Sequence, residues 1–199
     1  MIKKIFISQR LDEVGKFNEE RNNLDVRFLK IFEKLNMIPI LIPNNITLSK
    51  KIIKNVKANG IILSPGGDAL KKDIRYDTEI LLLNYAKRNN IPLLGICRGA
   101  QAINIYFGGK IKVIQNHVRK KHILKSDLTN KKNIKTNCYH DYGIKNDYLA
   151  KNLQVLGTSS DNSIELFKHK SKKIMGMMWH PERFKKLREF ELKIFKGFF

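Results

Sequence analysis

The chain has 199 residues, of which 42% are apolar, and a formal net charge of +21. This length allows one domain with a sizeable core. The sequence has no apolar run near the ~18 residues that a membrane-spanning helix requires, and the apolar run at its N-terminus is too short for a signal peptide. Two cysteines make no disulfide framework. We therefore expect a single domain over residues 1–199, cytoplasmic and without a membrane partner.

The positive charge has three possible meanings. A charge of this size is common in nucleic-acid-binding proteins. However, most of the basic residues are lysines, which form no block of five or more, whereas phosphate and base recognition favours arginine. The charge is better explained by a solvated lysine-rich surface, or by a field that attracts an anionic small substrate. We expect no nucleic-acid partner.

Apolar runs alternate with amphipathic segments through the first half of the chain. Strands are predicted at 3–8, 38–43, 60–64 and 91–96, and helices at 19–35, 47–57, 76–89 and 98–109. Strands of nearly continuous apolar character between helices are typical of a parallel sheet covered on both faces. The loops that follow such strands lie along one edge of the sheet, where chemistry is expected.

The second half has a different pattern. Short strands with turn signals between them are predicted at 111–115, 122–128, 153–160, 163–169 and 173–179, followed by a helix at 184–197. The sequence therefore predicts an α/β fold with an open, mostly parallel sheet, helices on both faces, and short antiparallel strands in the second half.

The motif "GICRGAQ" places Cys97 between a predicted strand and a predicted helix. Gly95 and Gly99 remove side chains that would crowd so sharp a turn. The N-terminus of the following helix stabilises a negative charge such as a thiolate. The amide of Arg98, one residue further on, can bind an oxyanion. Cys97 is thus a candidate nucleophile, although a small residue packed between strand and helix is the alternative.

A nucleophilic cysteine needs a base, and His180 is the strongest candidate among five histidines. It follows the apolar run "IMGMMW", so it lies at the same strand-end edge as Cys97. Pro181 ends the strand, and Glu182 can turn back to accept a hydrogen bond from the other ring nitrogen. A third segment, "LSPGGD", also follows a strand, and its Gly67 amide can serve as a second oxyanion donor. That segment could equally be an ordinary turn.

These motifs resemble the class I (triad) glutamine amidotransferase superfamily, which has a flavodoxin-like fold. The resemblance is greatest for its γ-glutamyl hydrolase branch, peptidase C26. It is carried by "FISQRL", "GIILSPGGD", the run ending in "LLGICRGAQAINIYFGG", "TNCYHDYGI" and "MGMMWHPER", in the family's order and spacing. The resemblance implies that Cys97 is the nucleophile, His180 the base and Glu182 its orienting residue. It also implies an oxyanion hole formed by the amides of Gly67 and Arg98.

The resemblance further implies a substrate pocket. Gln101 would hold the glutamyl group, and the stretch 137–142 would line the pocket, largely through backbone groups. The side chains predicted at the substrate are Gln101, Asn137, Tyr139, His140, Asp141 and Tyr142. Cys138 and Asp141 stand where relatives often have serine and a second histidine, and we expect Cys138 to be a bystander. No metal or organic cofactor is expected, because the sequence has neither zinc-ligand spacing nor a phosphate-binding loop motif.

The implied activity is hydrolysis of a γ-glutamyl amide through a cysteine thioester, releasing glutamate. In its short length and many lysines the chain resembles one member of this branch, and that resemblance implies an anionic substrate, γ-glutamyl-CDP-amidate, whose hydrolysis gives cytidine diphosphoramidate for capsule polysaccharide. Four alternatives remain at this point. The chain could hydrolyse another γ-glutamyl amine such as γ-glutamyl-γ-aminobutyrate, or be a glutaminase subunit that supplies ammonia to a partner synthetase. It could also be a binding or regulatory protein with the same fold, or a nucleic-acid-binding module, which the charge suggests but no recognition motif supports. The sequence does not indicate an oligomeric state.

Overall fold

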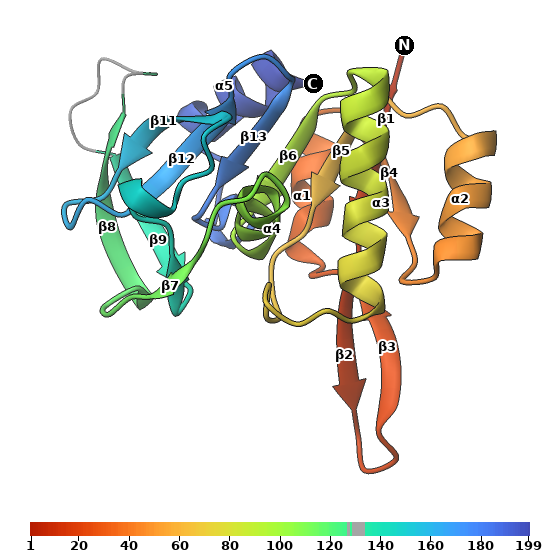
Figure 1. The fold of residues 1–199 in the computed structure, drawn as a ribbon. Helices are drawn as coiled ribbons and strands as arrows, with labels where there is room; N and C mark the ends of the chain where they lie inside the picture. Colours follow the sequence, from red (N-terminus) through yellow and green to blue (C-terminus); the bar gives the residue numbers. More distant parts are fainter. Residues whose placement is uncertain (127, 129–133) are drawn as a thin grey trace.

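The computed structural model describes residues 1–126, 128 and 134–199 and is built around one nine-stranded sheet (Figure 1). In spatial order the strands are β4 (Met37–Ile42), β1 (Lys3–Ser8), β5 (Gly60–Leu63), β6 (Leu93–Ile96), β13 (Ile174–Met177), β12 (Ile164–His169), β11 (Leu153–Thr158), β8 (Val118–Ser126) and β9 (Ile134–Tyr139). The first five run parallel to one another, and the remaining strands pair antiparallel. This confirms the predicted α/β architecture.

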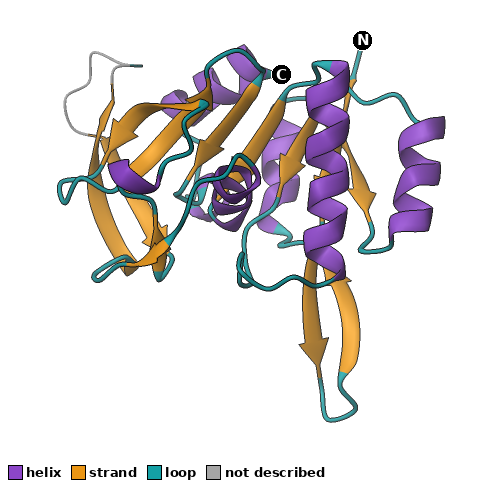
Figure 2. Ribbon diagram, viewed as in Figure 1, coloured by secondary structure: helices purple, strands orange, loops and turns teal. Residues whose placement is uncertain are grey.

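The strands at the centre of the parallel half are buried along their whole length. All four residues of β5 and all four of β6 are buried, which is why their sequences are continuous apolar runs rather than alternating ones. Helices α1 (Arg27–Lys34) and α5 (Glu189–Phe198) pack into one core cluster, and α3 (Ile74–Asn89) and α4 (Arg98–Tyr106) into another. Helix α2 (Ile46–Asn55) packs against the second cluster. Figure 2 shows helices on both faces of the sheet.

One predicted helix is partly wrong. The segment 19–35 contains α1 only from Arg27, and its first part is strand β3 (Glu19–Asn23), paired antiparallel with β2 (Arg10–Val14). This hairpin projects away from the body of the protein (Figure 1). Its strands are polar because they are largely exposed, and so they lack the apolar alternation that identifies a half-buried strand. Its turn contains Gly15 and Asn18, both at positive φ, which is the signal that could have located it.

Smaller differences concern the second half. The final helix begins at Glu189, not at 184, and a 3₁₀ turn, Pro181–Arg183, follows His180. The sequence pattern did not predict β9, and it placed β8 several residues too late. Two short strands, β7 (Lys112–Val113) and β10 (Tyr142–Gly143), pair with each other outside the main sheet, and a second 3₁₀ turn covers Asn146–Tyr148.

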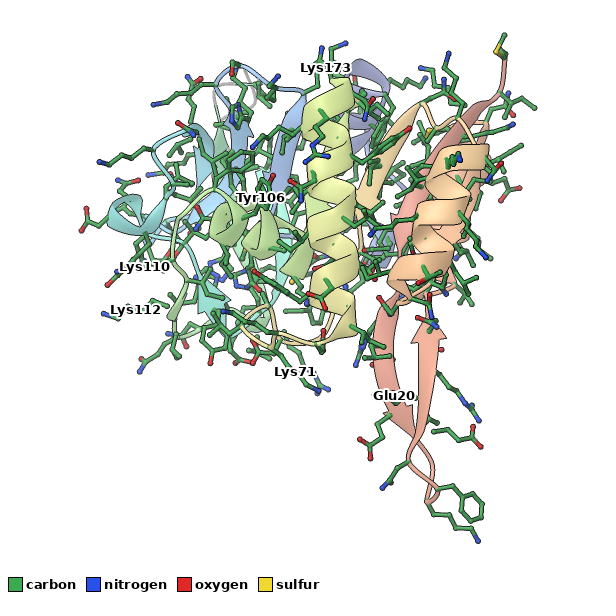
Figure 3. All side chains as sticks on the ribbon, turned by 45° about the vertical axis from the view of Figure 1, so that its right-hand side comes forward. Glu20, Lys71, Tyr106, Lys110, Lys112 and Lys173 are labelled. Atoms are coloured by element: carbon green, nitrogen blue, oxygen red, sulfur yellow. The ribbon has the colours of Figure 1, made fainter. Side chains whose placement is uncertain are left out.

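The lysines lie on the surface. Every lysine that the structure describes is exposed, except Lys145, which is partly buried. In Figure 3 the labelled Lys71 and Lys112 extend away from the ribbon. This supports the interpretation of the charge as a solvated surface. Among the described residues, no helix is long and apolar enough to cross a membrane.

Candidate active site

Three segments predicted to carry chemistry meet at one edge of the sheet. Strand β6 lies between β5 and β13 and is parallel to both, so the residues after these three strands are neighbours. The Cys97 amide donates to the Met177 carbonyl at 2.7 Å, which ties the end of β6 to the end of β13. Cys97, His180 and the glycine loop after β5 therefore approach one another from adjacent strand ends.

Cys97 has the backbone of a strained turn. Its φ is 50° and its ψ is −105°, and α4 begins at the next residue. A Cβ on Gly95 would lie 2.4 Å from the Gly99 carbonyl oxygen, and a Cβ on Gly99 would lie 2.3 Å from the Leu63 carbonyl oxygen. Both glycines are therefore required by close backbone contact. This geometry presents the Cys97 thiol at the N-terminal end of α4, as the motif predicts.

His180 is held at its ring and along its backbone. Its Nδ1 lies 2.6 Å from Glu182 Oε1, and both side chains are buried. The Asn137 amide accepts from the His180 N–H at 2.8 Å and donates to the His180 carbonyl at 2.9 Å. Tyr139 contacts the imidazole edge-on, with ring centroids 5.4 Å apart. The imidazole orientation is thus fixed by residues from two separate parts of the chain.

The electrostatics of His180 favour its charged form. Burial alone lowers the pKa of His180, but its electrostatic interactions with Cys97, followed by those with Glu182, outweigh burial and raise the pKa to about 9. Because Glu182 occupies Nδ1, Nε2 is the nitrogen left for the thiol. Nε2 has no partner at standard hydrogen-bond geometry, so this contact is looser than the bond to Glu182. Catalytic hydrogen bonds are often long without substrate.

The glycine loop after β5 is held by a buried arginine that the sequence pattern did not single out. Gly66 and Gly67 both have positive φ, 88° and 77°. The Arg75 guanidinium donates to the Gly66 carbonyl and to the Ser64 carbonyl, both at 2.7 Å. Arg75 is 2% exposed and is fixed from the first turn of α3. The loop carrying the candidate oxyanion donor therefore has a defined position.

A carboxylate joins this loop to the nucleophile turn. Glu79, one helical turn after Arg75, accepts from Arg75 Nε at 3.1 Å and also pairs with Arg98. Arg98 Nε in turn donates to the Asp68 carbonyl at 3.3 Å. Two buried arginines thus share one buried acid. The sequence signal that could have located this network is the i, i+4 spacing of Arg75 and Glu79 in the first turns of a helix.

A cavity of about 420 Å³ opens at Cys97 and His180. It is lined by Arg10, Gly66, Gly67, Asp68, Ala69, Cys97, Arg98, Gln101, Tyr139, His140, Asp141, Tyr142, His180 and Arg183. The structure thus brings most of the predicted substrate residues to one cavity. Asn137 is the exception, because its side chain is used to hold His180. Gln101 lies at the wall, where its Nε2 donates to the Tyr142 carbonyl at 2.8 Å.

An adjoining cavity of about 270 Å³ shares Arg10, Gly66, His180 and Arg183 with the first. Arg183 lies over the Tyr139 ring, 4.0 Å from its centroid. Arg10 comes from the start of the β2–β3 hairpin, and its side chain is half exposed beside Asp12. Among the described residues that line the two cavities, the permanently charged basic side chains are arginines, and none is a lysine. Arg10 and Arg183 were not singled out from the sequence.

Comparison with known proteins identifies the family. The model of the class-I glutamine amidotransferase family matches residues 21–199. The chain belongs to this family. A γ-glutamyl-CDP-amidate hydrolase from Campylobacter jejuni is 35% identical to this amidotransferase in an alignment of 188 positions that covers 90% of each chain. One subunit of the glutamine-hydrolysing GMP synthase of Methanococcus vannielii is 33% identical over 153 residues, covering 73% of this chain and 75% of that protein.

Solved structures agree on the fold. A crystal structure described as a GMP synthase subunit from Thermoplasma acidophilum superposes with a TM-score of 0.73 at 23% identity, covering all of this chain and 92% of that one. A glutamine amidotransferase from Thermotoga maritima gives a TM-score of 0.69 at 16% identity, covering 99% of this chain and 84% of that one. These likenesses establish the architecture of this amidotransferase and leave its substrate to be argued from the site.

Proposed function

We propose that this chain hydrolyses a γ-glutamyl amide through a thioester on Cys97 and releases glutamate. The observation that carries the proposal is the arrangement of Cys97, His180 and Glu182 at adjacent strand ends, with Glu182 Oε1 2.6 Å from His180 Nδ1. A cysteine paired with an oriented imidazole is the arrangement used for nucleophilic attack on an acyl carbon. A thiol nucleophile has to stay reduced, which suits the cytoplasm.

The reaction would proceed in two steps. The Cys97 thiolate attacks the γ-carbonyl carbon, and the resulting oxyanion accepts hydrogen bonds from the amides of Gly67 and Arg98. Protonated His180 gives its proton to the leaving nitrogen as the C–N bond breaks, which leaves a γ-glutamyl thioester. Water, deprotonated by the now neutral His180, attacks the thioester. Glutamate departs, and the thiolate and imidazolium are restored. Removal of one oxyanion donor typically costs about 10²–10³ in kcat.

The glutamyl group would bind in the cavity that contains Cys97. Gln101 and the segment 139–142 form its wall on the side of the antiparallel strands. The bond between Gln101 and the Tyr142 carbonyl fixes that wall relative to α4, which carries the nucleophile turn. Exposed Asp141 can pair with the α-amino group of the substrate, and this is the role that we assign to it.

For the leaving group, we favour an anionic one such as the cytidine diphosphate of γ-glutamyl-CDP-amidate. Arg10 and Arg183 line both cavities around His180, and arginine binds phosphate oxygens in a bidentate manner. The Campylobacter relative, which carries that substrate in its name, matches this chain over 90% of its length. A role in capsule polysaccharide synthesis would follow from that substrate.

The second candidate function is that of a glutaminase subunit that passes ammonia to a synthetase. The similarity to the GMP synthase subunit of Methanococcus vannielii favours it. A protein of that kind would act on glutamine and would gain activity only with its partner. The two candidates share the triad, so they differ in substrate and not in the chemistry at Cys97.

The experiment is glutamate release from four compounds: glutamine, γ-glutamyl-γ-aminobutyrate, a γ-glutamyl polyamine and γ-glutamyl-CDP-amidate. The hydrolase proposal predicts release from the nucleotide amide by the isolated chain, abolished in Cys97→Ala. It also predicts that Arg183→Gln raises KM for the nucleotide amide more than for γ-glutamyl-γ-aminobutyrate. Release from glutamine alone, or from none of the four, would support the glutaminase function instead.

A further inference from the structure

Four potential metal ligands lie together in the interior, and one of them, His140, also lines the cavity at Cys97 and His180. They are His117, Cys138, His140 and Glu165, and one ligand atom from each lies within 4.8 Å of the others. All four residues are buried, at 5% exposure or less. They come from three places: the segment just before β8, the end of β9, and β12. The sequence shows no metal motif because these residues lack the regular spacing of a zinc-binding loop.

The outer sides of the two imidazoles are already satisfied. His117 Nε2 lies 3.2 Å from an Asp161 carboxylate oxygen, and His140 Nδ1 lies 3.0 Å from the Tyr142 carbonyl oxygen. Both partners only accept, so each of these nitrogens must carry the proton. In the neutral rings, His117 Nδ1 and His140 Nε2 then present lone pairs to the interior of the cluster.

The inner atoms lack partners. His117 Nδ1, His140 Nε2 and both oxygens of Glu165 are buried and make no hydrogen bond. Glu165 Oε1 lies 3.5 Å from His117 Nδ1 and 3.9 Å from His140 Nε2. Several acceptors thus face one another where water does not reach. Buried acceptors without a donor are costly, and one cation among them would satisfy them together.

We propose that His117, Cys138, His140 and Glu165 bind one zinc ion. Two nitrogens, one sulfur and one oxygen form a donor set that zinc accepts in tetrahedral geometry. A thiolate and a carboxylate would balance the two positive charges of the ion, so the buried site would be neutral. With zinc–ligand bonds of about 2.0–2.3 Å, the ligand atoms of a tetrahedral site lie roughly 3.3–3.6 Å apart. The four ligand atoms now lie within 4.8 Å of one another. The most widely separated of them would therefore move about 1 Å closer together on binding zinc.

The site would be structural, because four protein ligands leave no open position for substrate. The position of the zinc site next to β9 indicates which part of the protein it would stabilise. Successive residues of a strand point to opposite faces, and on β9 Asn137 and Tyr139 contact His180 while Cys138 belongs to the cluster. The zinc would therefore tie β9, β12 and the segment before β8 together behind the wall that holds His180. The Asp161 carboxylate and the Tyr142 carbonyl would orient the two imidazoles.

The alternative to a bound zinc ion is a protonated, metal-free cluster. A proton on Glu165 and the thiol proton of Cys138 could satisfy two of the acceptors without any metal. The first experiment therefore measures metal directly on the wild-type chain. Elemental analysis after growth with added zinc should give one zinc per chain. After removal by a chelator, titration with Co²⁺ should give tetrahedral d–d bands and a near-ultraviolet thiolate-to-cobalt band, and the melting temperature should fall on zinc removal and recover on its return.

The chain contains two cysteines, which gives a matched pair of variants. Cys97→Ala should keep the zinc and the thiolate-to-cobalt band, although the proposed function predicts that it is inactive. Cys138→Ser should lose the thiolate-to-cobalt band. Asp161→Asn should weaken metal binding by about 10–100-fold, as the loss of a hydrogen-bond partner of a metal ligand does. The proposal would be overturned if wild-type protein contained no zinc, gave no cobalt spectrum and kept its melting temperature in the presence of chelator. This test holds even if the variants fail to fold. The outcome does not depend on which substrate the enzyme uses.

Discussion

The side-chain amide of Asn137 bonds to both the N–H and the carbonyl of His180, at 2.8 and 2.9 Å. This pair of hydrogen bonds resembles the pairing between neighbouring strands, with a side chain in place of one backbone, and it links β9 to the segment after β13. It fixes the position of the His180 backbone at the end of the sheet, while Glu182 fixes the orientation of the ring. Asn137 thus acts through His180 and not by touching substrate.

We expect Asn137→Ala to lower kcat by about 10–100-fold, since a small displacement of a catalytic group can cost that much. KM for the γ-glutamyl substrate should change little. Asn55→Ala is the matched control, because Asn55 is exposed and its amide donates only to a carbonyl of its own helix. Steady-state kinetics decide the matter, and a change confined to KM would indicate that Asn137 contacts substrate after all.

Protonation of His180 should couple stability to pH. Its pKa is raised from 6.5 to about 9 in the folded chain, so the folded state binds this proton more tightly than the unfolded state. The stabilisation is therefore fully present below pH ~6.5 and is lost as pH rises through about 9. The size of the shift corresponds to roughly 3 kcal/mol.

Urea unfolding at pH 6.5 and pH 9.5 measures this loss. Cys97 provides the first of the contributions that raise the pKa of His180, so Cys97→Ala should lose less stability over the same range. If the wild-type chain and Cys97→Ala show the same pH dependence, the thiol and the imidazole do not form the coupled pair described above.

The acid shared by Arg75 and Arg98 should be essential to stability. Glu79→Gln keeps the size of the side chain but removes the buried carboxylate that two buried arginines share, and breaking a buried pair of this kind costs about 3–5 kcal/mol. Glu19→Gln is the control, since Glu19 pairs with Arg21 on the exposed hairpin, where the effect should stay within about 0.5 kcal/mol. Urea unfolding compares the two, and equal small losses would contradict the structural role given to Glu79.

Two glycines in helices should respond oppositely to alanine. In Gly99→Ala the new methyl group would meet the Leu63 carbonyl oxygen at 2.3 Å, so we expect a loss of about 1–3 kcal/mol and a displaced nucleophile turn. In α5, a Cβ on Gly197 has no atom within 4 Å, and Gly197→Ala should gain about 0.4–1 kcal/mol. A tolerated Gly99→Ala with full activity would show that the turn can relax. Thermal unfolding with an activity assay measures both.

The parts of the fold that could be predicted are those where burial determines the sequence. Strands β5, β6 and β13 are apolar because both faces of the sheet are covered, and their ends located the glycine loop, the candidate nucleophile and the base. The β2–β3 hairpin was missed because exposed strands are under no such constraint. The start of α5 was placed too early because apolar residues such as Phe184 and Leu187 pack against the core without being helical.

The missed parts of the site are those that depend on contacts distant in sequence. The bond from Asn137 to His180 spans 43 residues, and the one from Arg98 to Glu79 spans 19. The cluster of Cys138 with His117, His140 and Glu165 has the same origin, since antiparallel pairing in the second half brings its members together. Local motifs identify a residue's chemistry, and only the fold shows which residue holds it in place.

The most direct test of nucleophilic catalysis by Cys97 is to look for the covalent intermediate. Wild-type enzyme would be mixed with a γ-glutamyl substrate that it hydrolyses and quenched in acid during turnover. Its peptides would then be measured by mass spectrometry after digestion. The proposed thioester mechanism predicts a γ-glutamyl adduct on Cys97 and none on Cys138. Glutamate release without any adduct on Cys97, or an adduct on Cys138 instead, would contradict it.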